Sequence, residues 1–373
     1  MFGGIFEKAV VYWLKRRGYR HYAAHLVARK VREDVGLSKM LGYRTMVSAW
    51  STGFTGVFFH KLIDAGINPQ ECMPDIHYWK MHPINGSFSH WIDDKLTLKY
   101  LLTKHDQYLP RYYFYCKRAS VIPLMDCPKG LPDGADGVIQ LLRDKEHLAL
   151  KKNAGSLSIG FYRLDAIGGR FEVNGKEMSE QQLKDFVVAL DNYLVTEYVH
   201  AHPMLKQFYD KSPNIVRLIV VNPGGRNPEV AAAYLRIGQN RTGFVELSSS
   251  GGLFAGVDLE SGRIFKPRLF DGPRVQEVVE HPDTGAVLEG LIPHWAFAVQ
   301  TILQISRYVP NLCYLGWDLI ITEDGFRIIE INSLPGISYI QLYHPLLRSE
   351  AAAELFGRKN RQRSHVDATP MNQ

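Results

Sequence analysis

The sequence predicts an α+β protein, in which a mainly helical N-terminal region precedes a mixture of strands and helices. Three observations lead to this prediction. Residues 1–35 carry apolar side chains at helical spacing, and residues 290–308 show the same periodicity. The runs between them are short, apolar and rich in β-branched residues. The length of 373 residues fits one large domain or two to three packed subdomains.

Composition and charge describe a globular chain. Hydrophobic residues make up 46% and aromatic residues 12%, as in proteins with an ordinary packed core. The net charge of +6 fits an anionic small molecule, a membrane surface or nucleic acid, and does not choose among them. The basic C-terminal tail lacks interleaved aromatic residues and no groove-reading motif is present, so we expect no nucleic-acid binding.

Cysteine usage and hydropathy favour a cytoplasmic protein. The cysteines form no Cys-x-x-Cys pair and no zinc-like cluster with histidine, which is typical of reduced, buried thiols. No apolar run approaches the ~20 residues of a membrane span. The N-terminus lacks the layout of a signal peptide. The cysteines in question are Cys72, Cys116, Cys127 and Cys313.

Residues 1–35 are expected to form a helix with an apolar stripe and a basic remainder. The stripe includes Val10, Trp13 and Leu14, and Arg16 and Arg17 are among the basic residues. One interpretation is an interfacial helix that touches anionic lipid, which would make residues 1–35 a peripheral membrane contact. The other is a helix that packs its apolar side on the body of the protein. We favour the second because no wide, uninterrupted apolar face is visible.

Further elements follow along the chain. Asp94 precedes a capped amphipathic helix, and several apolar runs have the composition of strands. The expected order is a helix at 93–105, a strand ending at residue 151, a helix at 180–193, strands at 193–199, 214–221 and 231–237, and a helix at 290–308.

The most informative stretch covers residues 314–336. Two apolar, β-branched runs flank Glu323-Asp324-Gly325, and Asp-Gly is a strong hairpin signal. Strand alternation places Glu330 and Asn332 on one face. A hairpin closed at Asp324-Gly325 places Asp318 on the strand paired beside them.

This arrangement would bring three hard oxygen donors to one place. Mg²⁺ favours a few such donors together with phosphate oxygens. Acids within apolar strands are costly unless they are paired or bound to metal. An ordinary hairpin with its acids in solvent is the alternative. We prefer a Mg²⁺ site formed by Asp318, Glu330 and Asn332.

A second group of residues suits phosphate binding. Lys151 ends an apolar strand and precedes a loop that contains Gly155 and Ser156. Glycine lets the backbone approach phosphate oxygens, and the lysine adds a positive charge. The loop is not a Walker A motif, because Gly-Lys-Ser/Thr is missing. Taken alone, it reads equally well as a hairpin turn.

Three charged residues sit within or at the ends of apolar strands. Around Glu197 the backbone could bind an adenine edge and the carboxylate could take ribose hydroxyls, or Glu197 is a plain edge-strand residue. Arg217 and Arg236 each need an anionic partner inside a strand. That partner is either a structural carboxylate or a phosphate undergoing transfer.

Taken in order, these segments resemble the ATP-grasp superfamily, and most of all its branch of sugar-transfer-associated ATP-grasp proteins. The resemblance covers roughly residues 90–345. The Glu-x-Asn hairpin with its upstream Asp is its specific part. The matching order is Asp94-Lys95, Lys151 with its glycine loop, Thr196-Glu197-Tyr198-Val199, Asn214 to Arg217 with Arg236, Ser250-Gly251-Gly252, Gly316-Trp317-Asp318, and Glu330-Ile331-Asn332.

The resemblance implies an ATP-grasp fold, with two α+β subdomains clasping ATP after a mainly helical N-terminal region. It implies domain bounds of 1–92 for that region, which commonly shapes acceptor recognition in such enzymes. The small subdomain would span 93–200 and the C-terminal subdomain with the metal site 201–346. Residues 347–373 would form a flexible basic tail.

The resemblance also implies roles for the residues named above. Many carboxylate–amine ligases place Arg two residues before the first metal acid, where this chain has Gly316, so Arg236 or Arg217 is expected to supply that charge. The phosphates of ATP would be held by Lys95 and Lys151 with Gly155 and Ser156, adenosine by Glu197, Tyr198 and Val199, and one or two Mg²⁺ ions by Asp318, Glu330 and Asn332.

The implied activity is that of an ADP-forming carboxylate–amine ligase. A carboxylate and ATP would give an acyl-phosphate, and an amine would displace phosphate to form an amide. We expect small-molecule substrates, sugar- or amino-acid-linked, in glycan, cell-surface polymer or natural-product biosynthesis. A phosphotransferase on the same fold and a non-catalytic nucleotide-binding scaffold remain alternatives. The sequence does not decide the oligomeric state.

Overall fold

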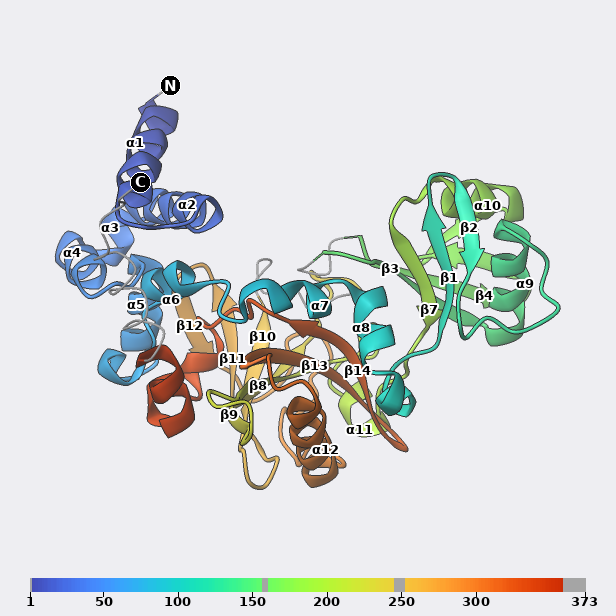
Figure 1. The fold of residues 1–373 in the computed structure, drawn as a ribbon. Coiled ribbons are helices and arrows are strands. Elements are labelled where there is room, and N and C mark those ends of the chain that lie inside the picture. The colour runs from blue at the N-terminus through green and yellow to red at the C-terminus, as the bar shows by residue number, and fades with distance from the viewer. Residues whose placement is uncertain (1, 156–159, 245–251, 358–373) are drawn as a thin grey trace.

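The computed structural model describes residues 2–155, 160–244 and 252–357. Helices dominate as far as residue 101, and two antiparallel seven-stranded sheets follow. Figure 1 shows the N-terminal helices at one end of the molecule, the large sheet in the middle and the small sheet at the other end. The α+β prediction with a mainly helical N-terminal region is therefore confirmed.

The N-terminal region differs from the single helix expected over 1–35. The chain turns at Gly18, whose φ of +81° lies in the left-handed region that glycine adopts without strain. Leu14 of the apolar stripe is buried between the two resulting helices and Ile76, whereas Trp13 stays about half exposed. The helices are α1 (Phe2–Arg16), α2 (His21–Gly36), α3 (Ser38–Leu41), α4 (Tyr43–Ser51), α5 (Gly56–Asp64), α6 (Asp75–Met81), α7 (His90–Asp93) and α8 (Lys95–Leu101).

A buried carboxylate ties these helices together. Asp34 accepts hydrogen bonds from the backbone N–H groups of Gly56 at 2.6 Å and Val57 at 2.9 Å, and from Nε1 of Trp50 at 2.9 Å. The two N–H groups belong to the first turn of α5, where intrahelical partners are missing. Asp34 of α2 therefore caps α5 and holds α4 beside it.

The small sheet has the strand order β2-β1-β7-β3-β4-β5-β6. Helices α9 (Ala135–Lys145) and α10 (Glu180–Ala189) pack beside it, as Figure 1 shows. Helix α10 ends before the expected residue 193, because Leu190 is extended. The strands are β1 (Tyr112–Lys117), β2 (Ser120–Pro123), β3 (His147–Lys152), β4 (Tyr162–Ile167), β5 (Arg170–Val173), β6 (Lys176–Met178) and β7 (Tyr193–Glu197).

The large sheet has the strand order β12-β11-β10-β9-β8-β13-β14. Helix α12 begins at Trp295 and not at the expected residue 290, because His294 before it is left-handed. The strands are β8 (Val216–Val221), β9 (Glu229–Ile237), β10 (Leu253–Val257), β11 (Ile264–Asp271), β12 (Arg274–Glu277), β13 (Tyr314–Thr322) and β14 (Gly325–Asn332), and the helices are α11 (Pro203–Lys206) and α12 (Trp295–Tyr308).

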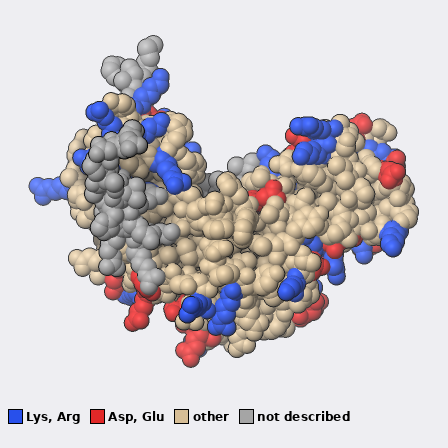
Figure 2. All heavy atoms as spheres, in the orientation of Figure 1, with Lys and Arg blue, Asp and Glu red and all other residues tan. Residues whose placement is uncertain are grey.

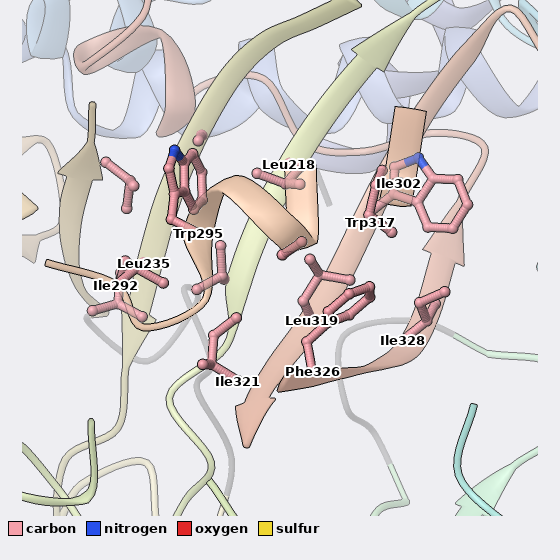
Figure 3. Packing of buried hydrophobic residues seen from close by; sticks show 14 of the residues in the cluster. Leu218, Leu235, Ile292, Trp295, Ile302, Trp317, Leu319, Ile321, Phe326 and Ile328 are labelled. Carbon is pink, nitrogen blue, oxygen red and sulfur yellow. The ribbon is translucent and has the colours of Figure 1, made fainter. Parts of the chain in front are cut away.

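One face of the large sheet packs against α12. Trp317, Leu319 and Ile321 alternate along β13 toward this core, and Phe326 and Ile328 of β14 join them (Figure 3). This burial fixes the orientation of β13, because the residues between them must point to the opposite face of the sheet.

The opposite face is covered in part by the N-terminal helices. Ile219 and Phe254 pack there with Phe58 and Tyr78. Residues 350–357 are helical and add Phe356 to the same cluster. The buried core therefore extends past residue 346, where the sequence places the start of a flexible tail. Short 3₁₀ turns cover Pro69–Glu71, Gly86–Ser89, Thr103–Tyr108, Ile340–Leu342 and Leu346–Arg348.

Candidate active site

The β13–β14 hairpin brings the predicted metal ligands together. Thr322 pairs with Gly325, so Glu323 and Asp324 form the turn. Asp318 lies opposite Glu330, and Gly316 lies opposite Asn332. Between these two blocks the register shifts by one residue at Ile329, which is a β-bulge.

The bulge decides which face carries the acids. Without it, the register at the turn would place Ile329 opposite Asp318, and Glu330 would share a face with Trp317. The extra residue turns Glu330 and Asn332 to the face of Asp318, while Phe326 stays in the core. The convergence that the sequence predicts is present in the structure, and it depends on this bulge.

Asp318 is the centre of an ion-pair cluster. Arg217, directly opposite it on β8, donates from Nε to Oδ1 and from Nη2 to Oδ2, the latter at 2.6 Å. Nη2 of Arg236 lies 2.8 Å from the same Oδ2. Both arginines singled out in the sequence therefore meet at one carboxylate.

The charges around Asp318 outweigh its burial. Burial alone would raise the pKa of Asp318, but the guanidinium charges of Arg217 and Arg236 hold the pKa below its ordinary value. Burial would lower the pKa of Arg217, and Asp318 raises it instead. Asp318 and Arg217 are therefore both charged at neutral pH.

Gly316 explains why this chain lacks an arginine two residues before Asp318. A side chain there would meet Cβ of Pro335 at 2.5 Å and Nη1 of Arg217 at 3.6 Å. Arg217 thus reaches from the neighbouring strand toward the space beside Gly316. The two candidates for the expected positive charge therefore lie on neighbouring strands, Arg217 on β8 and Arg236 on β9.

Two lysines approach this site from the other side. Lys95, the first residue of α8, lies with Nζ 3.4 Å from Oε1 of Glu330 and 3.3 Å from the carbonyl oxygen of Gly155. The ammonium nitrogen of Lys151 lies over the Tyr112 ring, 5.1 Å from its centre. Burial, and then the charge of Lys95, lower the pKa of Lys151 to about 7.

Asn153 holds the two lysine segments together, and sequence reasoning missed it. Its carbonyl oxygen accepts from the N–H of Lys95 at 3.0 Å, and its Oδ1 accepts from the N–H of Leu96 at 2.8 Å. Its Nδ2 donates to Asp94, the cap of α8, at 2.6 Å. The sequence signal that could have indicated this role is the amide side chain of Asn153, two residues after Lys151, which can bond the capped start of a helix.

The donor set fits Mg²⁺. An ionised carboxylate offers about four lone-pair sites. Arg217 occupies one site on each oxygen of Asp318, and Arg236 occupies a second site on Oδ2. One site on Oδ1 is therefore left for a metal ion. Among the described residues no hydrogen-bond partner reaches the buried Nδ2 of Asn332. The candidate set consists of two carboxylates, Asp318 and Glu330, and the amide oxygen of Asn332. Within the described ranges, no group of three or more His, Cys, Asp or Glu side chains gathers as a metal site.

The predicted adenosine segment links the two sheets. Oε2 of Glu197 accepts from the N–H of Arg111 at 3.0 Å, and Tyr198 stacks with Arg163. Val199 packs on Ile320 of β13. A cavity of about 350 Å³ opens beside all three predicted residues, Glu197, Tyr198 and Val199.

The predicted phosphate and metal residues converge, and the adenosine segment lies at the joint between the sheets. Figure 2 shows the surface hollowed between the N-terminal region and the small sheet. Basic side chains outnumber acidic ones in the cluster, so its field favours an anion. Ser156, and Ser250 and Gly251 of a second loop, lie outside the described residues.

Solved structures with a similar fold are ATP-grasp ligases at low identity. The D-alanine–D-alanine ligase of Coxiella burnetii is 13% identical, with 74% of this chain and 60% of that chain covered and a TM-score of 0.37. The D-alanyl-alanine synthetase A of Vibrio cholerae is 13% identical, with 74% and 67% covered and a TM-score of 0.42. The ligase PsnB, solved with a minimal precursor, Mg and ADP, is 13% identical, with 75% and 61% covered and a TM-score of 0.36.

The chain spans less than two thirds of the length of the first of these structures. No curated protein matches its sequence. The family described as sugar-transfer associated ATP-grasp matches residues 80–353, which is most of the chain. The matched range contains both sheets, both lysines, both arginines and the acidic hairpin.

Proposed function

Because the chain belongs to the sugar-transfer associated ATP-grasp family, we propose that it is an ATP-dependent carboxylate–amine ligase that forms an amide through an acyl-phosphate. The observation that carries this proposal is the meeting of Asp318, Glu330 and Asn332 with Arg217 and Arg236 on one face of the large sheet. Such a cluster serves phosphoryl transfer by charge and position. ADP and phosphate would be released.

Each group has a distinct task in this proposal. Lys95 and Lys151 bind the phosphates of ATP from the small-sheet side, and the backbone of Glu197 to Val199 positions adenine. Asp318, Glu330 and Asn332 would hold Mg²⁺, which, when bound, neutralises charge on the transferring phosphate. The buried setting strengthens these interactions and keeps water from the acyl-phosphate.

The arginines would act on the substrate carboxylate and the phosphoryl group. Arg236 has the unused donor, because no described residue accepts from its buried Nε. A carboxylate oxygen held there would lie beside the metal ligands and attack the γ-phosphorus, with ADP leaving. The amine nitrogen would then attack the acyl carbon. The bond between that carbon and the phosphate oxygen would break, and phosphate would leave with its electron pair.

We propose a sugar- or amino-acid-linked substrate in glycan, cell-surface polymer or natural-product biosynthesis. The family description, which names sugar transfer, supports the sugar-linked case. We further propose that the enzyme works in the cytoplasm, where ATP and Mg²⁺ are available. The helical residues 1–92 would contribute to acceptor recognition, since they cover the part of the sheet next to the cluster.

The direct test is ³¹P NMR of the protein with Mg·ATP and a mixed pool of amino acids and sugar acids. We expect ADP and inorganic phosphate to appear only when both a carboxylate and an amine are present. A new phosphoester signal without free phosphate would identify a phosphotransferase instead. Tight nucleotide binding by calorimetry, without turnover of any pool, would favour the scaffold.

Nucleotide affinity should depend on pH through Lys151. Its pKa of about 7 in the free protein must rise when a polyphosphate lies beside it, because a nearby negative charge favours the ammonium form. Binding therefore takes up a proton. We expect the affinity for Mg·ADP to fall by up to about tenfold per pH unit as the pH rises above about 7. Calorimetry in buffers of different ionisation enthalpy would measure the uptake.

The Lys151→Arg variant is the control for this prediction. A guanidinium stays protonated throughout this range, so the variant should bind Mg·ADP with little pH dependence between about pH 7 and 9. If the wild-type protein bound Mg·ADP equally well over that range, Lys151 would not be a phosphate ligand.

A further inference from the structure

A large cavity lies away from the charged cluster, in the N-terminal region. It has a volume of about 1150 Å³, above the usual size of a small-molecule site of about 300–1,000 Å³. Helices α1, α2 and α6, the end of α4 and residues 350–357 surround it. Figure 1 places these elements at the end of the molecule opposite the small sheet.

The wall of this cavity is apolar. Trp13, Trp50 and Phe356 contribute aromatic surface, and most of the other lining side chains are aliphatic. A concave apolar wall that is open to water suits an apolar ligand. The aliphatic lining residues include Val10, Leu14, Val27, Val31, Ile76 and Leu347.

The charged groups at the cavity are cations. Arg17 stacks on Trp13 at 4.1 Å and Lys80 lies over Tyr19 at 5.4 Å, and all four residues line the cavity. None of the described lining residues is acidic. Burial, and then Lys80, lower the pKa of His77, so this imidazole is neutral at pH 7. The fitting ligand has a long apolar part and a negative head.

Helix α1 carries the surface features of an interfacial helix beside this cavity. The Tyr12 side chain is 62% exposed and Trp13 52%, and Arg16 lies over the Tyr12 ring at 5.4 Å. Aromatic rings with adjacent arginines are favoured where hydrocarbon meets polar headgroups. No helix in the described residues has the length and apolarity needed to cross a bilayer.

We propose that this cavity takes the hydrocarbon chain of an anionic membrane lipid, and that α1 thereby docks the protein on a membrane surface. The chain would lie between α1, α2 and residues 350–357, with its negative head beside Arg17 and Lys80. The sequence after Gly357 contains Arg358, Lys359, Arg361 and Arg363 and few apolar residues, so its composition does not match the apolar wall of the cavity. This proposal is independent of the ligase activity.

The test is flotation of the full chain with vesicles of phosphatidylcholine alone or with about one third phosphatidylglycerol. We expect flotation only with the anionic vesicles. Arg17→Glu should reduce partitioning by about tenfold, whereas Arg29→Glu, the same charge change at an exposed site on α2 outside the cavity, should reduce it less than about threefold. Both positions are exposed, so both variants should keep the wild-type melting temperature.

Insertion into the cavity is tested by quenching of tryptophan fluorescence with phosphatidylglycerol brominated in its acyl chains. We expect quenching that falls sharply in Trp13→Phe. Equal loss of flotation in the two charge variants, or flotation without quenching, would overturn the proposal. Either result would indicate non-specific electrostatic attraction between the basic protein and the anionic vesicles. A concentration-dependent dimer that Trp13→Ala disperses, without flotation, would make a second copy of the chain the occupant. Quenching by a monomeric dodecyl phosphate brominated in its alkyl chain, without flotation, would reassign the cavity to a free amphiphile.

Discussion

An Asp318→Ala protein is expected to lose about 3–5 kcal/mol of unfolding free energy, because Arg217 would remain buried without its partner. Arg217 has 7% of its surface exposed and makes two hydrogen bonds to Asp318. Arg236 would lose its ion pair as well. Urea denaturation followed by circular dichroism would measure the loss. Loss of activity in this variant would therefore not identify a metal ligand.

The matched control removes both charges. An Arg217→Met/Asp318→Leu double variant should recover much of the stability, because apolar residues of similar volume can replace a buried ion pair at little cost. A single Asp318→Ala variant that lost less than about 1 kcal/mol would show that water or a rearranged side chain satisfies Arg217.

The same ion pairs predict an acid dependence of stability. The folded pKa of Asp318 lies below its unfolded value of about 3.9. The stabilisation is thus present above about pH 4 and is lost as the pH falls through the folded pKa. The Asp318→Ala protein should lack this part of the acid transition.

A Glu330→Gln protein is expected to keep its stability and lose at least about 100-fold in ATP turnover. Its carboxylate makes one long contact, at 3.4 Å to Lys95, and is partly exposed, so its removal should cost less than about 1 kcal/mol. A ligand to Mg²⁺ in the proposed site would be lost. Turnover measured against Mg²⁺ concentration should show a raised Mg²⁺ requirement.

Asp324→Asn is the matched control on the same hairpin. Asp324 lies in the turn, contacts Thr322 and Arg327, and is exposed, so this change should leave turnover unchanged. Wild-type turnover and an unchanged Mg²⁺ requirement in Glu330→Gln would exclude Glu330 as a metal ligand.

Local signals in the sequence were sufficient to predict the hairpin, the strand character of its flanks and the chemistry of its polar residues. The Asp-Gly turn follows from backbone preference, and Asp318 within an apolar run already requires a partner. The order of motifs also identified the ATP-grasp fold. These features depend on neighbours in the chain, which the sequence displays directly.

Element ends were less predictable. The break at Gly18 and the late start of α12 after His294 depend on single left-handed residues. The burial of residues 350–357 depends on the N-terminal helices, far away in the chain. Periodicity alone contains neither kind of information.

By itself, the sequence determined the family, the α+β architecture and the residues that would carry the chemistry. Only the tertiary structure decided how those residues meet. The bulge at Ile329 turns Glu330 and Asn332 to the face of Asp318, because α12 holds Phe326 and Ile328 in the core on the other side. The pairing of β8 with β13 selects Arg217 as the partner of Asp318. Such pairings join residues that are distant in the chain, so they follow from packing of the whole sheet.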